Sequence, residues 1–238
     1  AALGFYTFAY RIPDLIIRNS NFVVGKVAFP LLAQVQSNAD DLRVAYGTLL
    51  RYVSLFTIPA GIGLALIAPR FINVFFPDRW EPATEVMQLI ALSLAISSIG
   101  HLPGIIYKAI NRPEILNWMS VIKLIATGGV LWYCVRWGIE GVAAGQVGLA
   151  IFFVVIDMVV VARVLGFGSV DMLKAIAPSL ACTQAMAGAV VLLDRGLAPN
   201  GLGGLLAIVA VAVAVYAVTL ATVSTDTVTS ARKVIRSA

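Results

Sequence analysis

The sequence predicts an all-α protein, a polytopic membrane helix bundle with about seven transmembrane helices. Of its 238 residues, 60% are hydrophobic and only 12% are charged, against roughly 25% charged residues in a typical soluble domain. The mean hydropathy is +0.94. A hydrocarbon core about 30 Å thick is crossed by roughly 20 apolar residues in a helix, and several runs in the chain reach that length. These observations exclude a water-soluble fold.

Seven spans follow one another along the chain. Five spans contain an uncharged apolar run that is long enough by itself: 52–75, in which the run ends before Arg70, 86–107, 141–162, 175–193 and 202–223. A sixth span, 115–135, contains Lys123, and the first span in the chain, 13–34, carries charge in its outer half. Runs such as LLAIVAVAVAVYAVTLATV are apolar on every side, which is typical of membrane helices. The strands of a transmembrane barrel would instead alternate apolar and polar residues.

The distribution of basic residues predicts the orientation of these spans. With seven spans, one set of loops and tail contains nine cations: Arg43, Arg51, Lys108, Arg112, Arg163, Lys174, Arg232, Lys233 and Arg236. The opposite set contains four, Arg70, Arg79, Arg136 and Arg195. Cytoplasmic loops of membrane proteins are rich in Lys and Arg, so we expect the first set and the C-terminus to be cytoplasmic. The net charge of +5 is therefore explained without nucleic acid. The expected location is a cytoplasmic (inner) membrane.

The residues that support catalysis or metal binding are scarce. The chain has one His and two Cys, and it contains no HExxH, CxxC or GxSxG motif. We therefore expect no enzyme, no catalytic residue, no metal site and no cofactor. Asp78, Glu81 and Glu85 are close in sequence, but we interpret them as a solvated helix start, where acidic groups favour the helix dipole.

A polar stripe runs along the first span. At 100° per residue, one arc of about 80° holds Arg11, Asp14, Arg18, Asn21 and Gly25, with Lys26 about 60° further round. Charges at membrane depth are costly unless they face a cavity or a partner. In one interpretation Arg11 and Arg18 reach the outer headgroups, with Asp14 bridging them. In the other, which we favour, the stripe lines a water-filled cavity, and Arg11, Asp14, Arg18 and Lys26 bind substrate.

Two further charges lie inside neighbouring spans. Lys123 is about 12 Å from the predicted cytoplasmic end of its span, and Asp157 is about 8 Å from the same end of the next. Consecutive spans are antiparallel, so the two side chains can meet. We predict a buried, structural ion pair, because an unpaired charge at that depth would be costly.

Several segments resemble a known family. They are FPLLAQVQ at the end of the first span, FFPDRW followed by MQLIAL, and the NRP turn at residues 111–113. Together with the surrounding residues, they resemble the second half of the Wzx-type polysaccharide flippases, members of the multidrug/oligosaccharidyl-lipid/polysaccharide exporter superfamily. The resemblance covers nearly the whole chain. None of these segments is a catalytic signature or identifies a substrate.

The resemblance implies a transporter with two helical lobes around a central cavity. The chain begins AALGFYTFAY, without an initiator Met, and we expect it to be the C-terminal lobe, 1–238, with the N-terminal lobe absent. The implied partners are the bilayer, that missing lobe and a lipid-linked oligosaccharide of the polyprenyl diphosphate type. The implied function is flipping of this lipid by alternating access. Two alternatives stay open: an ion-coupled multidrug antiporter of the same superfamily, and a subunit of a membrane-embedded glycosyltransferase or polymerase.

Overall fold

The protein is a bundle of long helices. The computed structural model describes residues 2–166, 168–196 and 201–223, and in these residues there is no strand. The helices are α1 (Ala2–Gln34), α2 (Ala39–Phe75), α3 (Ala83–Ile99), α4 (Leu102–Ala109), α5 (Pro113–Cys134), α6 (Gly138–Leu165), α7 (Ser169–Gly196) and α8 (Leu202–Val223), with single 3-10 turns at Asp78–Trp80 and Val135–Trp137. The predicted all-α class is confirmed.

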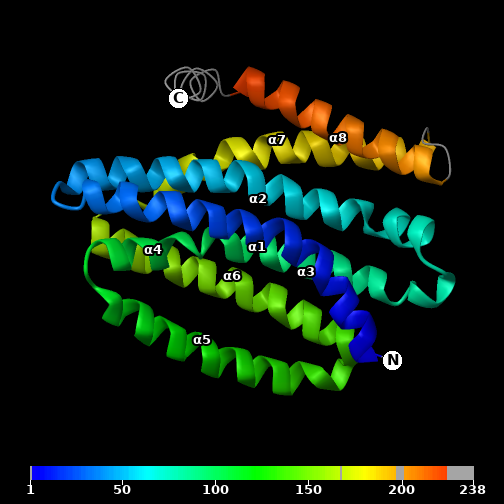
Figure 1. Ribbon diagram of the computed structural model, residues 1–238, viewed down its shortest axis with the longest axis horizontal. Helices are drawn as coiled ribbons and strands as arrows, with labels where there is room; N and C mark the ends of the chain where they lie inside the picture. Colours follow the sequence, from blue (N-terminus) through cyan, green and yellow to red (C-terminus); the bar gives the residue numbers. More distant parts are fainter. Residues whose placement is uncertain (1, 167, 197–200, 224–238) are drawn as a thin grey trace.

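The helices run back and forth along the long axis of the bundle, which is horizontal in Figure 1. Among the described residues, six helical stretches are long and apolar enough to cross a membrane. One of them, Pro113–Leu165, contains both α5 and α6, which turn back on each other at the Val135–Trp137 turn. The described part of the chain therefore passes along the bundle seven times, with α3 and α4 together forming one pass. It is a multi-pass membrane protein.

Several helices extend beyond the spans expected from the sequence. α1 begins at Ala2, well before Pro13, and α2 begins at Ala39, well before Tyr52. The start of α2 is polar, and the side chain of Asn38 caps it by accepting hydrogen bonds from the backbone N–H groups of Asp40 and Asp41. A helix can thus continue past its apolar run. The expected spans mark the apolar runs, whereas the helices are longer.

One pass is interrupted. α3 ends at Ile99, and α4 starts at Leu102 after a turn at Gly100 and His101. Pro103 lies in the first turn of α4, where its missing N–H has no helical partner to lose. α4 therefore continues in the direction of α3 as a separate eight-residue helix.

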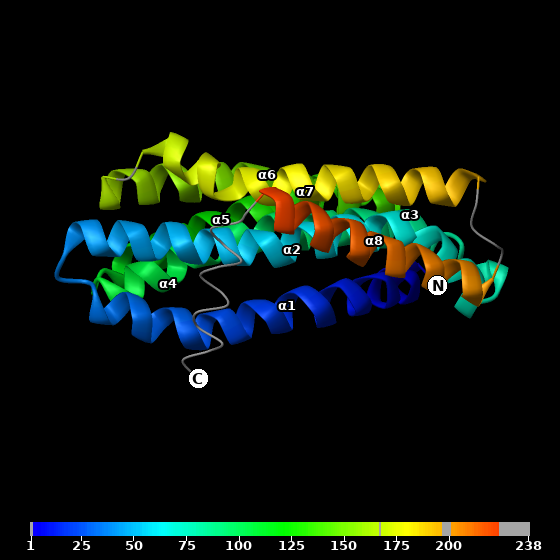
Figure 2. The ribbon, with the colours of Figure 1, turned by 90° about the horizontal axis from the view of Figure 1, so that it is seen from above.

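α3 lies in the centre of the bundle and packs against α1, α2 and α6. Its contact with α2 is close at Gly61, where an added Cβ would overlap the Cβ of Ala95 and lie 2.8 Å from the carbonyl oxygen of Ala91. α7 and α8 pack at the α2 side, and α5 forms the opposite edge against α6 (Figures 1 and 2). α1 therefore has one side on α3 and one side uncovered.

The two ends of the bundle differ. At one end, which we call the α4 end, lie the α1–α2, α4–α5 and α6–α7 connections. There Arg43 Nε donates a hydrogen bond of 2.7 Å to the carbonyl of Leu165, which joins α2 to the end of α6. At the other end, the aromatic end, Phe8 of α1 packs on Phe76 and Trp80, with ring centroids 4.5 and 4.6 Å away. These aromatic contacts hold the start of α1 against the turn at Asp78–Trp80. The predicted cytoplasmic tail, with Arg232, Lys233 and Arg236, lies outside the described residues.

Candidate functional site

The polar stripe of α1 lines a cavity. This arginine cavity has a volume of about 690 Å³ and is lined by Arg11, Asp14 and Arg18, together with Tyr6, Thr7, Tyr10, Ile12, Leu15, Asn19 and Gln146. All but Gln146 lie on α1, so the helical repeat collects them on one side. Gln146 arrives from α6 and donates a hydrogen bond of 2.7 Å to the hydroxyl of Tyr6.

An ion pair holds one of the arginines. Arg18 Nη2 lies 3.3 Å from Asp14 Oδ2, one helical turn away. The Arg18 side chain is 76% exposed, whereas that of Asp14 is only 18% exposed. Asp14 Oδ1 is buried, without a hydrogen-bond partner among the described residues. Asp14 therefore fixes one side of the guanidinium group, and the rest of that group faces open space.

The position of Arg18 along α1 bears on the two interpretations of the stripe. α1 has 33 residues, about 50 Å at 1.5 Å per residue, so Arg18 lies about 24 Å from the first residue. A hydrocarbon core of about 30 Å centred on such a helix contains this position. Charges at that depth occur where a cavity or a partner receives them. The length of α1 therefore favours a cavity-lining stripe over one that reaches the headgroups.

A second cavity continues from the first. This middle cavity, about 300 Å³, shares Tyr10 and Gln146 with the arginine cavity. Its other lining residues come from α3, α5, α6 and the turn at Gly100, and they include the polar side chains Ser93, Ser97, Thr127, Lys123 and Asp157. The two cavities are therefore neighbours along the same furrow between α1 and the α5–α6 hairpin.

The two charges predicted to pair inside α5 and α6 are brought together. Lys123 Nζ lies 2.6 Å from Asp157 Oδ2, and the Asp157 side chain is only 4% exposed, against 36% for Lys123. Gly100 gives this carboxylate room, because an added Cβ there would lie 3.0 Å from Asp157 Oδ2. The pair thus joins α5 to α6, beside the α3–α4 turn.

A third cavity lies beyond this ion pair, toward the α4 end. We call it the histidine cavity; its volume is about 160 Å³, and it shares Gly100, Lys123 and Asp157 with the middle cavity. Its remaining lining residues come from the α3–α4 turn, α4 and α5: His101, Gly104, Ile105, Tyr107, Lys108, Leu116, Met119 and Ser120. Tyr107 and Lys108 were not among the residues that the sequence singled out as a site.

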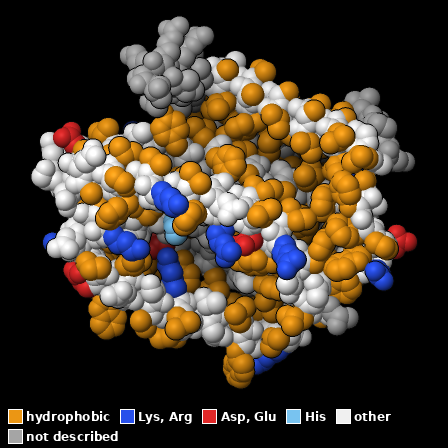
Figure 3. Space-filling model, viewed as in Figure 1, with side chains coloured by type: hydrophobic (Ala, Val, Ile, Leu, Met, Phe, Trp, Pro, Cys, Tyr) orange, Lys and Arg blue, Asp and Glu red, His pale blue; other side chains and the backbone are white. Residues whose placement is uncertain are grey.

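The three cavities form one groove with a positive charge balance. Among the described residues, its lining includes the cations Arg11, Arg18, Lys108 and Lys123 and the carboxylates Asp14 and Asp157. Figure 3 shows basic side chains gathered across the middle of this face, around the histidine, with hydrophobic side chains on both sides. A basic groove within an apolar surface is suited to an amphipathic anion.

Two members of the predicted stripe lie apart from the arginine cavity. Lys26 is not among its lining residues, and its Nζ lies 4.3 Å from the centre of the Phe22 ring. Asn21 donates a hydrogen bond of 3.0 Å to Ser98 Oγ of α3, so it joins two helices. The structure brings Arg11, Asp14 and Arg18 together and leaves Lys26 nearer the α4 end.

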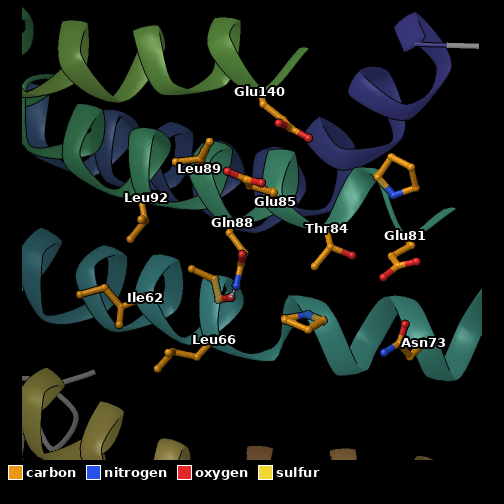
Figure 4. Close-up of a pocket in the computed structure, with 13 residues that line it drawn as sticks. Ile62, Leu66, Asn73, Glu81, Thr84, Glu85, Gln88, Leu89, Leu92 and Glu140 are labelled. Atoms are coloured by element: carbon orange, nitrogen blue, oxygen red, sulfur yellow. Dashed lines mark hydrogen bonds between the residues drawn. The ribbon is translucent and has the colours of Figure 1, made fainter. Parts of the chain in front are cut away.

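A larger cavity lies on the other side of α3. This glutamate cavity has a volume of about 860 Å³ between α2 and α3, and its lining includes Glu81, Glu85 and Glu140 (Figure 4). Glu81 and Glu85 were expected at a solvated helix start, and all three side chains are indeed exposed. Glu140 comes from α6, which the spacing of the sequence did not reveal. Within the described part of the chain, no group of three or more His, Cys, Asp or Glu residues could hold a metal ion.

Comparisons of sequence and fold point to one group of proteins. Residues 1–85 match the family described as polysaccharide biosynthesis protein. The chain is 26% identical over 156 residues to the lipopolysaccharide biosynthesis protein WzxC of Escherichia coli (strain K12), and 25% identical over 137 residues to the teichuronic acid biosynthesis protein TuaB of Bacillus subtilis (strain 168). These matches cover 66% and 58% of this chain, but only 30% and 28% of the relatives.

The fold has a counterpart among solved structures. The lipid II flippase MurJ, in an inward closed conformation, matches with a TM-score of 0.78 over 95% of this chain and 48% of its own, at 19% identity. This likeness concerns the fold. The resemblance predicted from the residues is confirmed by the sequence comparisons: the chain is similar to polysaccharide biosynthesis proteins that include WzxC and TuaB, and its fold is similar to that of a lipid flippase.

Proposed function

We propose that this chain is the substrate-binding C-terminal lobe of a flippase that moves lipid-linked oligosaccharides across the cytoplasmic membrane. The names of its relatives, in lipopolysaccharide and teichuronic acid biosynthesis and in lipid II flipping, support this function. Two of these names refer to polysaccharide biosynthesis and one to lipid flipping, and we propose a transporter and not an enzyme.

The continuity of the basic groove is the observation that carries the proposal. A polyprenyl diphosphate sugar joins a strongly anionic group to a long apolar chain. The groove offers guanidinium and ammonium groups in a furrow, and the surrounding surface is apolar. Arginine binds diphosphate oxygens in pairs through its planar fork. Arg11 and Arg18 would take the diphosphate, and Asp14 would hold Arg18 in position.

Alternating access explains why the charges lie on an uncovered side of the lobe. In a two-lobed transporter the substrate site lies between the lobes, near the middle of the membrane. The groove would face the N-terminal lobe, and water in the shared cavity would solvate Arg18. The α4 end, where the predicted cytoplasmic loops meet, would face the cytoplasm.

Lys123 and Asp157 have a structural role in this proposal. Their contact closes the floor of the groove between the middle and histidine cavities. Lys26 remains a predicted substrate contact, reached at another stage of transport because it lies nearer the α4 end. We expect its contribution to be smaller than that of Arg18.

The proposal is tested by polysaccharide export in cells that depend on the complete transporter. Arg18→Ala should abolish export while membrane insertion stays normal, and Arg18→Lys should restore it only in part, because an ammonium group lacks the fork. Arg136→Ala is the matched control, since Arg136 packs against Tyr133, 5.0 Å from its ring centre, away from the groove. Unimpaired export with Arg11, Arg18 and Lys26 all replaced by Ala would contradict the proposal.

A further inference from the structure

The histidine cavity contains a buried hydroxyl group that lacks a partner. Tyr107 is 1% exposed and lines the cavity, and its Oη has no hydrogen-bond partner among the described residues. Buried hydroxyl groups are nearly always hydrogen-bonded, because leaving one unsatisfied is costly. An occupant of the cavity would supply the missing partner.

The polar groups around Tyr107 define what that occupant must be. Lys108 and Lys123 carry ammonium groups with three donors each, and the hydroxyl of Ser120 already donates to the carbonyl of Leu116. Asp157, the carboxylate of the cavity, accepts a hydrogen bond from Lys123. Donors therefore outnumber acceptors, because the carboxylate of Asp157 is already paired with Lys123.

We propose that the histidine cavity is a second anion site, which binds one phosphate group between Tyr107, Lys108 and Lys123. A phosphate offers several acceptor oxygens at once, so that it satisfies the tyrosine hydroxyl and both ammonium groups. The volume of about 160 Å³ suits a single phosphate group and excludes a sugar chain. The phosphate comes either from the headgroup of an anionic membrane lipid or from the diphosphate of a transported lipid.

The site is separate from the arginine cavity. The Lys123–Asp157 pair and the middle cavity lie between them. A diphosphate that enters at the α4 end would therefore meet the histidine cavity first and the arginines second. This loading role rests on the proposed function, whereas phosphate binding rests on the cavity alone.

Thermal unfolding of the purified protein tests the binding. The protein carries Arg11→Gln and Arg18→Gln, so that the arginine cavity does not contribute, and it is placed in nanodiscs of neutral phosphatidylcholine. Inorganic diphosphate should raise its melting temperature. Tyr107→Phe and Lys108→Gln should each raise the concentration needed for half of this shift by roughly tenfold, the effect of one lost hydrogen bond to a charged group.

Tyr107→Phe also separates a ligand site from a simple packing defect. It removes an unsatisfied hydroxyl, so the ligand-free protein should melt at the same or a higher temperature. Thr183→Val is the matched control: Thr183 Oγ1 is likewise buried without a partner among the described residues, on α7, away from the groove. That variant should keep the full response to diphosphate.

Nanodiscs of phosphatidylglycerol distinguish the two sources of phosphate. If a lipid headgroup fills the site, this lipid alone raises the melting temperature through Tyr107, and diphosphate adds nothing. If the diphosphate of a transported lipid fills it, both lipids give the same starting temperature, and diphosphate raises each. The absence of any Tyr107-dependent shift in either lipid overturns the inference. Export that is lost with Arg18→Ala would then still support the proposed function.

Discussion

The two sides of α3 border cavities of opposite charge. On one side, Ser93 and Ser97 line the middle cavity of the basic groove. On the other, Glu85 and Gln88 line the glutamate cavity, together with Glu81 and Glu140. The glutamate cavity is larger than any single cavity of the groove, yet its carboxylates would repel an anion, whereas the cations of the groove would attract one. The comparison shows that charge, more than volume, indicates where a diphosphate lipid would bind.

The largest effect is expected from removing the charge of the groove. Arg11→Ala combined with Arg18→Ala should abolish polysaccharide export, because the two guanidinium groups of the arginine cavity are lost together. Export is measured in cells that depend on the complete transporter, with membrane content of the variant determined alongside.

Removing charge from the glutamate cavity tests the other side of α3 in the same way. Glu81→Gln combined with Glu85→Gln removes two charges from the glutamate cavity with little change in shape. Export should stay close to that of the unmodified protein. If the glutamate variant fails while the arginine variant exports normally, the roles of the two sides of α3 are the reverse of those proposed.

The next largest effect concerns the floor of the groove. Asp157→Ala leaves Lys123 without its partner at 2.6 Å. The cost should be about 2–3 kcal/mol, below the 3–5 kcal/mol of a fully buried pair because Lys123 is one third exposed. Thermal unfolding in detergent measures it. Lys123→Met in the same protein should recover most of the loss, and a double variant no more stable than Asp157→Ala would exclude an ion pair as the cause.

The close contact between α2 and α3 at Gly61 should be sensitive to the volume of the side chain at that position. Gly61→Val places side-chain atoms where α2 meets Ala91 and Ala95, and we expect a loss of about 1–3 kcal/mol. Gly63→Ala is the control, since an added Cβ there would lie 3.8 Å from Met186 Cε, an ordinary contact. Equal stability of the two variants would show that α2 and α3 separate easily.

The smallest effect is expected inside the glutamate cavity. Pro69 has no N–H, so the carbonyl of Ala65 loses its helical partner, and Gln88 Nε2 donates to it at 2.9 Å instead. Gln88→Ala should cost about 1 kcal/mol in unfolding free energy. Asn73→Ala, in the same cavity, should change stability by less than about 0.5 kcal/mol. If Asn73→Ala loses more unfolding free energy than Gln88→Ala, the hydrogen bond from Gln88 to Ala65 does not have the stabilising role proposed for it.

The sequence predicted those features that follow from repeats within one helix. The 3.6-residue period placed Arg11, Asp14 and Arg18 on one face, and the structure puts them in one cavity. The depths of Lys123 and Asp157 in consecutive spans were enough to anticipate their contact. Both are local relations, or relations between neighbouring antiparallel helices, which chain order determines.

Contacts between distant helices were not accessible in this way. Gln146 donates a hydrogen bond to Tyr6, which lies 140 positions earlier in the chain. Glu140 of α6 lines the same cavity as Glu85 of α3. Tyr107 could not be recognised as a site residue from the sequence, because a buried tyrosine in an apolar run looks like any other hydrophobic residue. The length of α1 was also underestimated, since hydropathy marks the apolar part of a helix and not its ends.

The turn at Gly100 and His101 has a mechanical consequence. A continuous helix transmits displacement along its axis through its hydrogen-bond ladder, and this ladder is broken between α3 and α4. α4 carries Tyr107 and Lys108, whereas α3 is fixed by its neighbours on three sides. A shift of α4 relative to α3 would therefore change the width of the groove at its α4 end.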